Sequence, residues 1–136
     1  MDISALEVDD TAPIHVKNAK GEPQYKEDGT PIRIVVFGPS SDAYARLETR
    51  QTQRAMKRLD DNDGKRTAMA PEEKLAQTAE DLADITHSID GLESGGKTGR
   101  ELALAIYGNR RLGHITNQVT AKLGDWGNFA PASPTG

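Results

Sequence analysis

Hydrophobic and polar residues alternate with a period of two near the start of the chain. In residues 32–37, apolar and polar side chains alternate at first, and the last residues are all apolar. A shorter run of residues that favour β-strands lies at 14–16. Loops containing Gly and Pro join the two runs, with Tyr25 between them as a candidate short strand. The pattern predicts an antiparallel hairpin over residues 12–38, in which the second run is the better-buried strand.

After this hairpin the apolar spacing becomes helical. Ser40 or Ser41 is the expected N-cap of a helix over 40–59, because its hydroxyl accepts a backbone N–H of the first turn. That helix is polar, with a thin apolar stripe. The acidic turn that follows has Leu59 and Ala70 where a calcium loop needs ligands, so we interpret it as a helix end.

The most periodic segment of the chain begins at Pro71. Apolar residues recur there at alternating four- and three-residue spacing as far as Ile89, and Gly91 follows. Glu72 and Glu73 occupy the first turn, where the positive end of the helix dipole favours acids. We therefore expect one amphipathic helix from Pro71 to the residues just before Gly91.

Two further helices are predicted after a glycine-rich turn. Thr98 and Glu101 have the spacing of a capping box and precede a short apolar helix at 102–107. Gly108 and the next residue break that helix. The last helix carries apolar residues at helical spacing, namely Leu112, Ile115, Val119 and Leu123.

The order of these elements predicts an α+β fold, with a small N-terminal antiparallel hairpin or sheet followed by three or four α-helices. Residues 12–129 are expected to form one domain. Residues 1–11 are predicted to be a mobile acidic arm, and 130–136 a disordered tail. Trp126 and Phe129 are interpreted as large side chains that close the core.

Composition limits the size of that core. Leu, Ile, Val and Phe make up 25 of the 136 residues, and the formal net charge is −4. The chain lacks cysteine, which excludes disulfides, thiol nucleophiles and cysteine metal sites. It also lacks a long apolar run or a signal segment, so we expect a soluble cytoplasmic protein without a membrane partner. The acidic pI of about 5.4 disfavours nucleic acid as a partner.

Charge is segregated along the sequence. Four arginines recur every fourth residue and therefore share one helix face: Arg46, Arg50, Arg54 and Arg58. Segment 71–93 holds seven acidic residues against one lysine. One interpretation places these two segments next to each other, and another makes the arginines a docking surface for an acidic partner. Nucleic-acid binding is a third interpretation, disfavoured because only Tyr44 interleaves the arginines.

The sharpest motif is Gly91-Leu92-Glu93-Ser94-Gly95-Gly96-Lys97-Thr98, which matches the nucleotide-binding pattern G-x-x-x-x-G-K-[ST]. A functional P-loop follows a buried strand, whereas a helix is predicted before this segment. We therefore favour a glycine turn in which Thr98 caps the next helix. The three histidines, His15, His87 and His114, lack metal-ligand spacing, and no serine has a nucleophile-elbow context, so no catalytic, cofactor or metal site is predicted.

The order of motifs resembles the tail assembly chaperones of long-tailed bacteriophages. The similar segments are the hairpin with Ile34-Val35-Val36-Phe37-Gly38, the Arg- and Gln-rich segment 50–54, Ile89-Asp90-Gly91-Leu92, and the ending Gly124-Asp125-Trp126-Gly127-Asn128-Phe129. The resemblance covers about residues 6–129. It departs at His87-Ser88, where members of the family often carry Gly-Trp.

This resemblance implies a nonstructural, non-enzymatic factor in the host cytoplasm that binds the tape measure protein, recruits tail tube subunits and is absent from the mature virion. Self-association is left open. The expected partner-binding residues are the four arginines together with Leu112, Ile115, Val119, Trp126 and Phe129. The alternatives are a structural virion component, such as a minor tail or head–tail connector protein, and a small P-loop nucleotide-binding protein.

Overall fold

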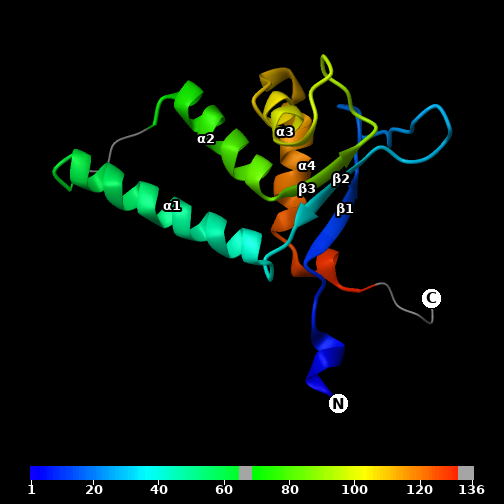
Figure 1. Cartoon of the computed structure of the whole chain (residues 1–136), viewed down its shortest axis with the longest axis horizontal. Coiled ribbons are helices and arrows are strands. Elements are labelled where there is room, and N and C mark those ends of the chain that lie inside the picture. Colours follow the sequence, from blue (N-terminus) through cyan, green and yellow to red (C-terminus); the bar gives the residue numbers. More distant parts are fainter. Residues whose placement is uncertain (65–68, 132–136) are drawn as a thin grey trace.

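The computed structural model describes residues 1–64 and 69–131, and it confirms the α+β class (Figure 1). Three strands form one antiparallel sheet in the order β1 (Thr11–His15), β2 (Arg33–Phe37) and β3 (Thr86–Asp90). Four helices accompany the sheet: α1 (Asp42–Asp61), α2 (Pro71–Asp84), α3 (Gly99–Tyr107) and α4 (Gly113–Leu123). Three short 3-10 turns lie at Ile3–Leu6, Arg110–Leu112 and Trp126–Phe129.

The predicted hairpin is formed by β1 and β2. Ala12 pairs with Val36 and Ile14 with Ile34, so these four side chains share one face of the sheet. All four are buried. The candidate strand at Tyr25 is only a single bridge to Pro31. The hairpin therefore contributes one apolar face, which the helices must cover.

Helix α1 begins where the sequence predicts, and only residues near its start are buried. Ser41 is its N-cap, and the Ser41 hydroxyl accepts the N–H of Tyr44 at 3.2 Å. Within α1 only Ala43 and Leu47 are buried. The rest of this twenty-residue helix extends away from the sheet (Figure 1).

The prediction of a single helix from Pro71 to the residues before Gly91 is wrong in its last six residues, 85–90. Helix α2 ends at Asp84, and the chain then forms the third strand, β3. The carbonyl of the fully buried Ile85 accepts the N–H of Phe37 at 2.7 Å, and Ile89 pairs with Ile34. The apolar spacing of residues 85–89 did not show whether they form a helix or a strand. The strand is favoured because it pairs the backbone N–H and C=O groups on the free edge of β2, which a longer helix would leave unpaired.

Gly91 is required at the end of β3. It has a φ of +98°, and a Cβ there would approach the side chains of Ile32 and Lys26 to 2.9 Å. Lys26 in turn bonds the Asp90 carboxylate at 3.0 Å. Both the backbone conformation and the close packing therefore select glycine at this turn.

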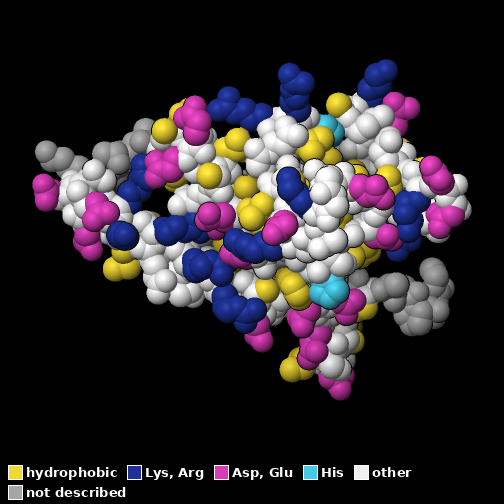
Figure 2. Space-filling view, turned by 45° about the horizontal axis from the view of Figure 1, so that its top comes forward, with side chains coloured by type: hydrophobic (Ala, Val, Ile, Leu, Met, Phe, Trp, Pro, Cys, Tyr) yellow, Lys and Arg dark blue, Asp and Glu magenta, His cyan; other side chains and the backbone are white. Residues whose placement is uncertain are grey.

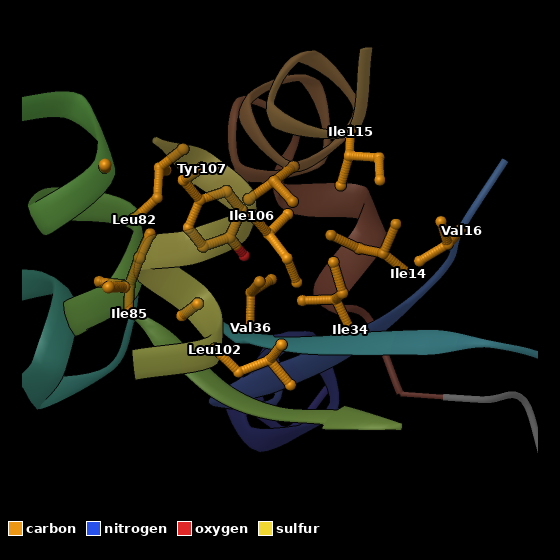
Figure 3. Close-up of a cluster of buried hydrophobic side chains, with 14 of the residues drawn as sticks. Ile14, Val16, Ile34, Val36, Leu82, Ile85, Leu102, Ile106, Tyr107 and Ile115 are labelled. Carbon is orange, nitrogen blue, oxygen red and sulfur yellow. The ribbon is translucent and has the colours of Figure 1, made fainter. Parts of the chain in front are cut away.

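The core lies between the sheet and the helices α2, α3 and α4. Figure 3 shows side chains from β1 and β2 pointing toward those of the helices. Within it the Thr86 hydroxyl is 2.8 Å from the Tyr107 hydroxyl and donates to the Leu82 carbonyl at 2.7 Å. Ile115, Val119 and Phe129 are also buried.

Two expectations for the C-terminal half need correction. Thr98 precedes α3 as its N-cap residue, but its side chain makes no capping hydrogen bond, so the predicted capping box is wrong. Trp126 does not close the core, since its side chain is 57% exposed, whereas Phe129 is 1% exposed. The mobility of arm 1–11 and the disorder of tail 130–136 stay predictions, and residues 132–136 lie outside the described residues. In the described part of the chain, no helix is long and apolar enough to cross a membrane.

Candidate functional site

The candidate site is a groove of about 970 Å³ between α2 and α3, which we call the α2/α3 groove. Its apolar lining comes from both helices and the glycine after α3: Leu75, Ala76, Ala79, Leu104, Ala105 and Gly108. Ala79 is buried, but Leu75, Leu104 and Ala105 are only half-buried and Ala76 is exposed. Figure 2 shows hydrophobic side chains reaching the surface between the two helices, with charged side chains around them.

The groove exists because the apolar stripe of α2 is longer than the core it covers. Leu82 and Ala83, near the end of α2, are buried in the core. Leu75 and Ala76, almost two turns earlier, lie on the same side of the helix. Small side chains at Ala76, Ala79 and Ala105 leave space there that larger residues would fill. The outer half of the stripe is therefore apolar and incompletely covered.

The rim of the groove is charged on both walls. Glu72 and Glu80 belong to α2, and Arg110 and Arg111 follow α3. Arg110 approaches Glu72 only to 3.7 Å, and both side chains are largely exposed. Exposed ion pairs of this kind contribute about 0–1 kcal/mol, so this contact does little to close the groove.

Three of the four arginines of α1 form ion pairs with acidic residues of α2. Arg50 pairs with Asp84 at 2.7 Å, Arg54 pairs with Asp81, and Arg58 pairs with Glu73 at 3.1 Å. This confirms the interpretation that the basic and acidic segments are neighbours. Arg46 is exposed and forms no ion pair with any residue that the structure describes.

The apolar residues predicted to bind a partner are divided between core and surface. Ile115, Val119 and Phe129 are buried inside the domain, Leu112 is half-buried, and Trp126 is exposed. None of these five residues lines the α2/α3 groove. Their role in partner binding, like that of the arginines, stays a prediction.

The groove residues were missed at the sequence level, although a signal was present. Leu75 and Ala79 stand on the periodic stripe that predicted the helix, and Leu104 and Ala105 belong to the short apolar helix. The sequence did not show which residues of these apolar stripes are buried against other elements of the protein. That depends on how far α2 extends beyond the sheet, which the local pattern does not encode.

The segment from Gly91 to Thr98 does follow a strand, so one premise used against a P-loop is wrong. That strand, β3, is however the edge of an antiparallel sheet, and most of its residues are exposed or half-buried. Lys97 and Thr98 are exposed as well. From Gly99 to the last described residue, 131, no strand follows. A P-loop needs a buried parallel strand and further strands beside it, so the surroundings differ from such a site.

Titratable groups with shifted pKa values lie away from the groove. Burial raises the pKa of Tyr107, and the hydrogen bond between the Tyr107 and Thr86 hydroxyls partly offsets this effect. Hydrogen bonds donated by the Thr30 hydroxyl and backbone N–H lower the pKa of Asp28, and hydrogen bonds donated by Ser4 lower the pKa of Asp2. In residues 1–64 and 69–131, no cluster of His, Asp and Glu has the arrangement needed to hold a metal ion. The chemistry of the groove is thus that of apolar contact with a charged rim.

Comparisons with protein-family models, with curated proteins and with solved structures find no match for this chain. The fold class therefore rests on the structure itself, and the family resemblance rests on the motifs quoted above.

Proposed function

We propose that this protein is a phage tail assembly chaperone that binds an amphipathic helix of the tape measure protein in the α2/α3 groove. The observation that carries the proposal is the incompletely covered apolar stripe of α2 and α3. Recruitment of tail tube subunits, action without catalysis in the host cytoplasm and absence from the virion are further parts of the proposal. These parts come from the sequence resemblance.

The dimensions of the groove suit a helical client. The part of α2 along the groove runs from Glu72 to Glu80, nine residues or about 13 Å at a rise of 1.5 Å per residue. A second cavity, lined by Pro71, Lys74, Leu75, Thr78 and Arg110, shares two of these residues with the groove and extends it along α2. A helix docked there would present apolar anchors at i, i+3 or i+4, and i+7.

Helix-in-groove binding also fits the need of the client. A tape measure protein is expected to be a long helical rod with apolar faces that would otherwise aggregate. Covering such a face with the groove removes apolar area from water on both partners, at about 25 cal/mol per Å². The mixed charges on the rim, from Glu72, Glu80, Arg110 and Arg111, keep the bound complex hydrated.

The test compares two alanines that are both exposed on helices. Ala76 lines the groove, whereas Ala45 lies on α1 outside it. When the protein is co-expressed with the tape measure protein, Ala76→Glu should leave the client in the insoluble fraction, because it places a charge on the apolar floor. Ala45→Glu should keep the client soluble.

Two results would contradict the proposal. One is an Ala76→Glu protein that is folded by circular dichroism and still solubilises and co-purifies with the client. The other is this chain at stoichiometric copy number in purified tails, measured by mass spectrometry, which would support a virion component instead.

A further inference from the structure

Beyond Leu47, helix α1 has no part in the hydrophobic core. Among the described residues of α1, the core includes Leu47, and Tyr44 packs against it, but no later residue of the helix does either. Met56 is 62% exposed and Leu59 is 39% exposed. The last fourteen residues of α1, 48–61, are therefore held in place by something other than apolar packing.

The contacts of this distal part are ionic. On α2, Glu73, Asp81 and Asp84 are spaced by eight and three residues and share one face. Each of them pairs with one arginine of α1, from Arg58 to Arg50 in antiparallel order. Gln51 adds one hydrogen bond to the Asp81 carboxylate at 3.3 Å.

The space between the two helices is also polar. A cavity of about 420 Å³ lies there, and most of its lining carries polar or charged side chains, including Arg54, Arg58, Glu73, Gln77 and Asp81. The arginine side chains are partly open to water, with Arg50, Arg54 and Arg58 41%, 31% and 30% exposed, and their partners Asp84, Asp81 and Glu73 are 24%, 15% and 57% exposed. Water and salt can therefore reach the seam between α1 and α2.

We propose that these three ion pairs hold the distal part of α1 against α2, and that it separates from α2 when they are screened or lost. The first turn of α1 stays in place, because the buried Ser41 hydroxyl bonds the Gly38 carbonyl at 2.7 Å and Ala43 and Leu47 are buried. Separation exposes Glu73 and Asp81, whereas Asp84 keeps its second ion pair, with Arg100 of α3, and the opposite side of α2 keeps its packing against α3. The inference concerns the chain alone and does not depend on the proposed function.

Spin labels measure this separation directly, because the chain has no cysteine and labels attach only where cysteines are introduced. One label pair, Gln53→Cys with Glu101→Cys, reports the distance from distal α1 to α3. A second pair, Lys74→Cys with Glu101→Cys, reports the distance from α2 to α3 and serves as the reference. All three positions are exposed.

Ionic strength is the first variable. The Debye length falls from about 30 Å at 10 mM salt to about 3 Å at 1 M. Electron–electron distance measurements should show one narrow distribution for the Gln53/Glu101 pair at 10 mM and a longer, broader one at 1 M. The Lys74/Glu101 distribution should stay unchanged.

Substitution is the second variable. The triple variant Arg50→Gln, Arg54→Gln, Arg58→Gln should give the longer, broader Gln53/Glu101 distribution already at 10 mM salt. The matched control removes three arginines that form no ion pair within residues 1–64 and 69–131: Arg33→Gln, Arg46→Gln, Arg111→Gln. It changes the net charge equally and should keep the narrow distribution.

The charge swap Arg54→Asp with Asp81→Arg should restore the short distance that Arg54→Asp alone loses. The proposal is overturned if the Gln53/Glu101 distribution is the same at 10 mM and 1 M salt and in the triple variant. It is equally overturned if the control variant opens as much as the triple variant, because net charge rather than the named pairs would then be responsible.

Discussion

Gly38 and Phe129 form the contact whose disruption gives the most specific prediction. Gly38 follows β2 and is buried, and a Cβ built on it would overlap the Cγ, Cδ1 and Cε1 atoms of the Phe129 ring. Phe129 is 1% exposed, so the ring has little free space into which to move. The φ of Gly38 is not in the left-handed region, so steric overlap alone opposes a side chain at this position.

The expected magnitudes follow from that overlap. Gly38→Ala should cost about 1–3 kcal/mol of unfolding free energy, as overpacking of a tight core does. Phe129→Ala should cost about 3–5 kcal/mol, because it leaves a cavity. In the double variant the new methyl group occupies space vacated by the ring. The double variant should therefore be more stable than the sum of the single effects predicts, by about 1–2 kcal/mol.

Urea denaturation followed by circular dichroism measures all four proteins. Gly113→Ala is the matched control, since Gly113 starts α4 and a Cβ there meets nothing within 4 Å. It should be neutral or stabilising by up to about 1 kcal/mol. Strictly additive costs in the cycle, or a Gly38→Ala protein as stable as the Gly113→Ala protein, would refute the packing argument.

Three further predictions follow from the structure. Ile115→Asp places an unpaired charge in the core and should cost several kcal/mol, so a variant that melts like the original chain would place Ile115 at the surface. Burial raises the pKa of Tyr107 above its usual 10, so the stability that this group contributes is complete below pH 10 and is lost as pH rises through the pKa of the folded protein. The urea midpoint of the original chain should therefore fall between pH 9.5 and about 11, and Tyr107→Phe should make that fall less steep. An equally steep fall in the variant would contradict this prediction. Lys97→Ala should change stability by no more than about 0.5 kcal/mol, and calorimetry should find no ATP or GTP affinity that depends on Lys97.

Sequence reasoning was most successful where one local signal decides the structure. The alternating run 32–37, the hydroxyl of Ser41 and the proline at 71 each predicted an element that the structure contains. It failed at 85–90, where an apolar spacing compatible with a helix is used by a strand. The pairing partner that decides the outcome, β2, lies about fifty residues earlier in the chain.

The candidate site was less accessible to sequence reasoning than the fold. The periodicity of α2 marks Leu75 and Leu82 equally as apolar face residues. Only the three-dimensional arrangement buries Leu82 and leaves Leu75 half-covered beside α3. By contrast, the segregation of charge in the sequence offered the correct placement of α1 beside α2 as one of three interpretations, and the ion pairs between the helices confirm that one.

Helix α4 and Phe129 bond the segments on either side of β1, and this has a consequence for synthesis on the ribosome. The Gln118 side chain bonds both the N–H and the carbonyl of Lys17, at 2.9 and 2.8 Å, and the N–H of Asp9 donates to the Phe129 carbonyl at 2.7 Å. Chains emerge from the N-terminus at about 5–20 residues per second, so β1 and β2 leave the ribosome well before α4 and Phe129. Their apolar face stays uncovered during that interval, and native packing of the nascent chain must wait until α4 and Phe129 have emerged.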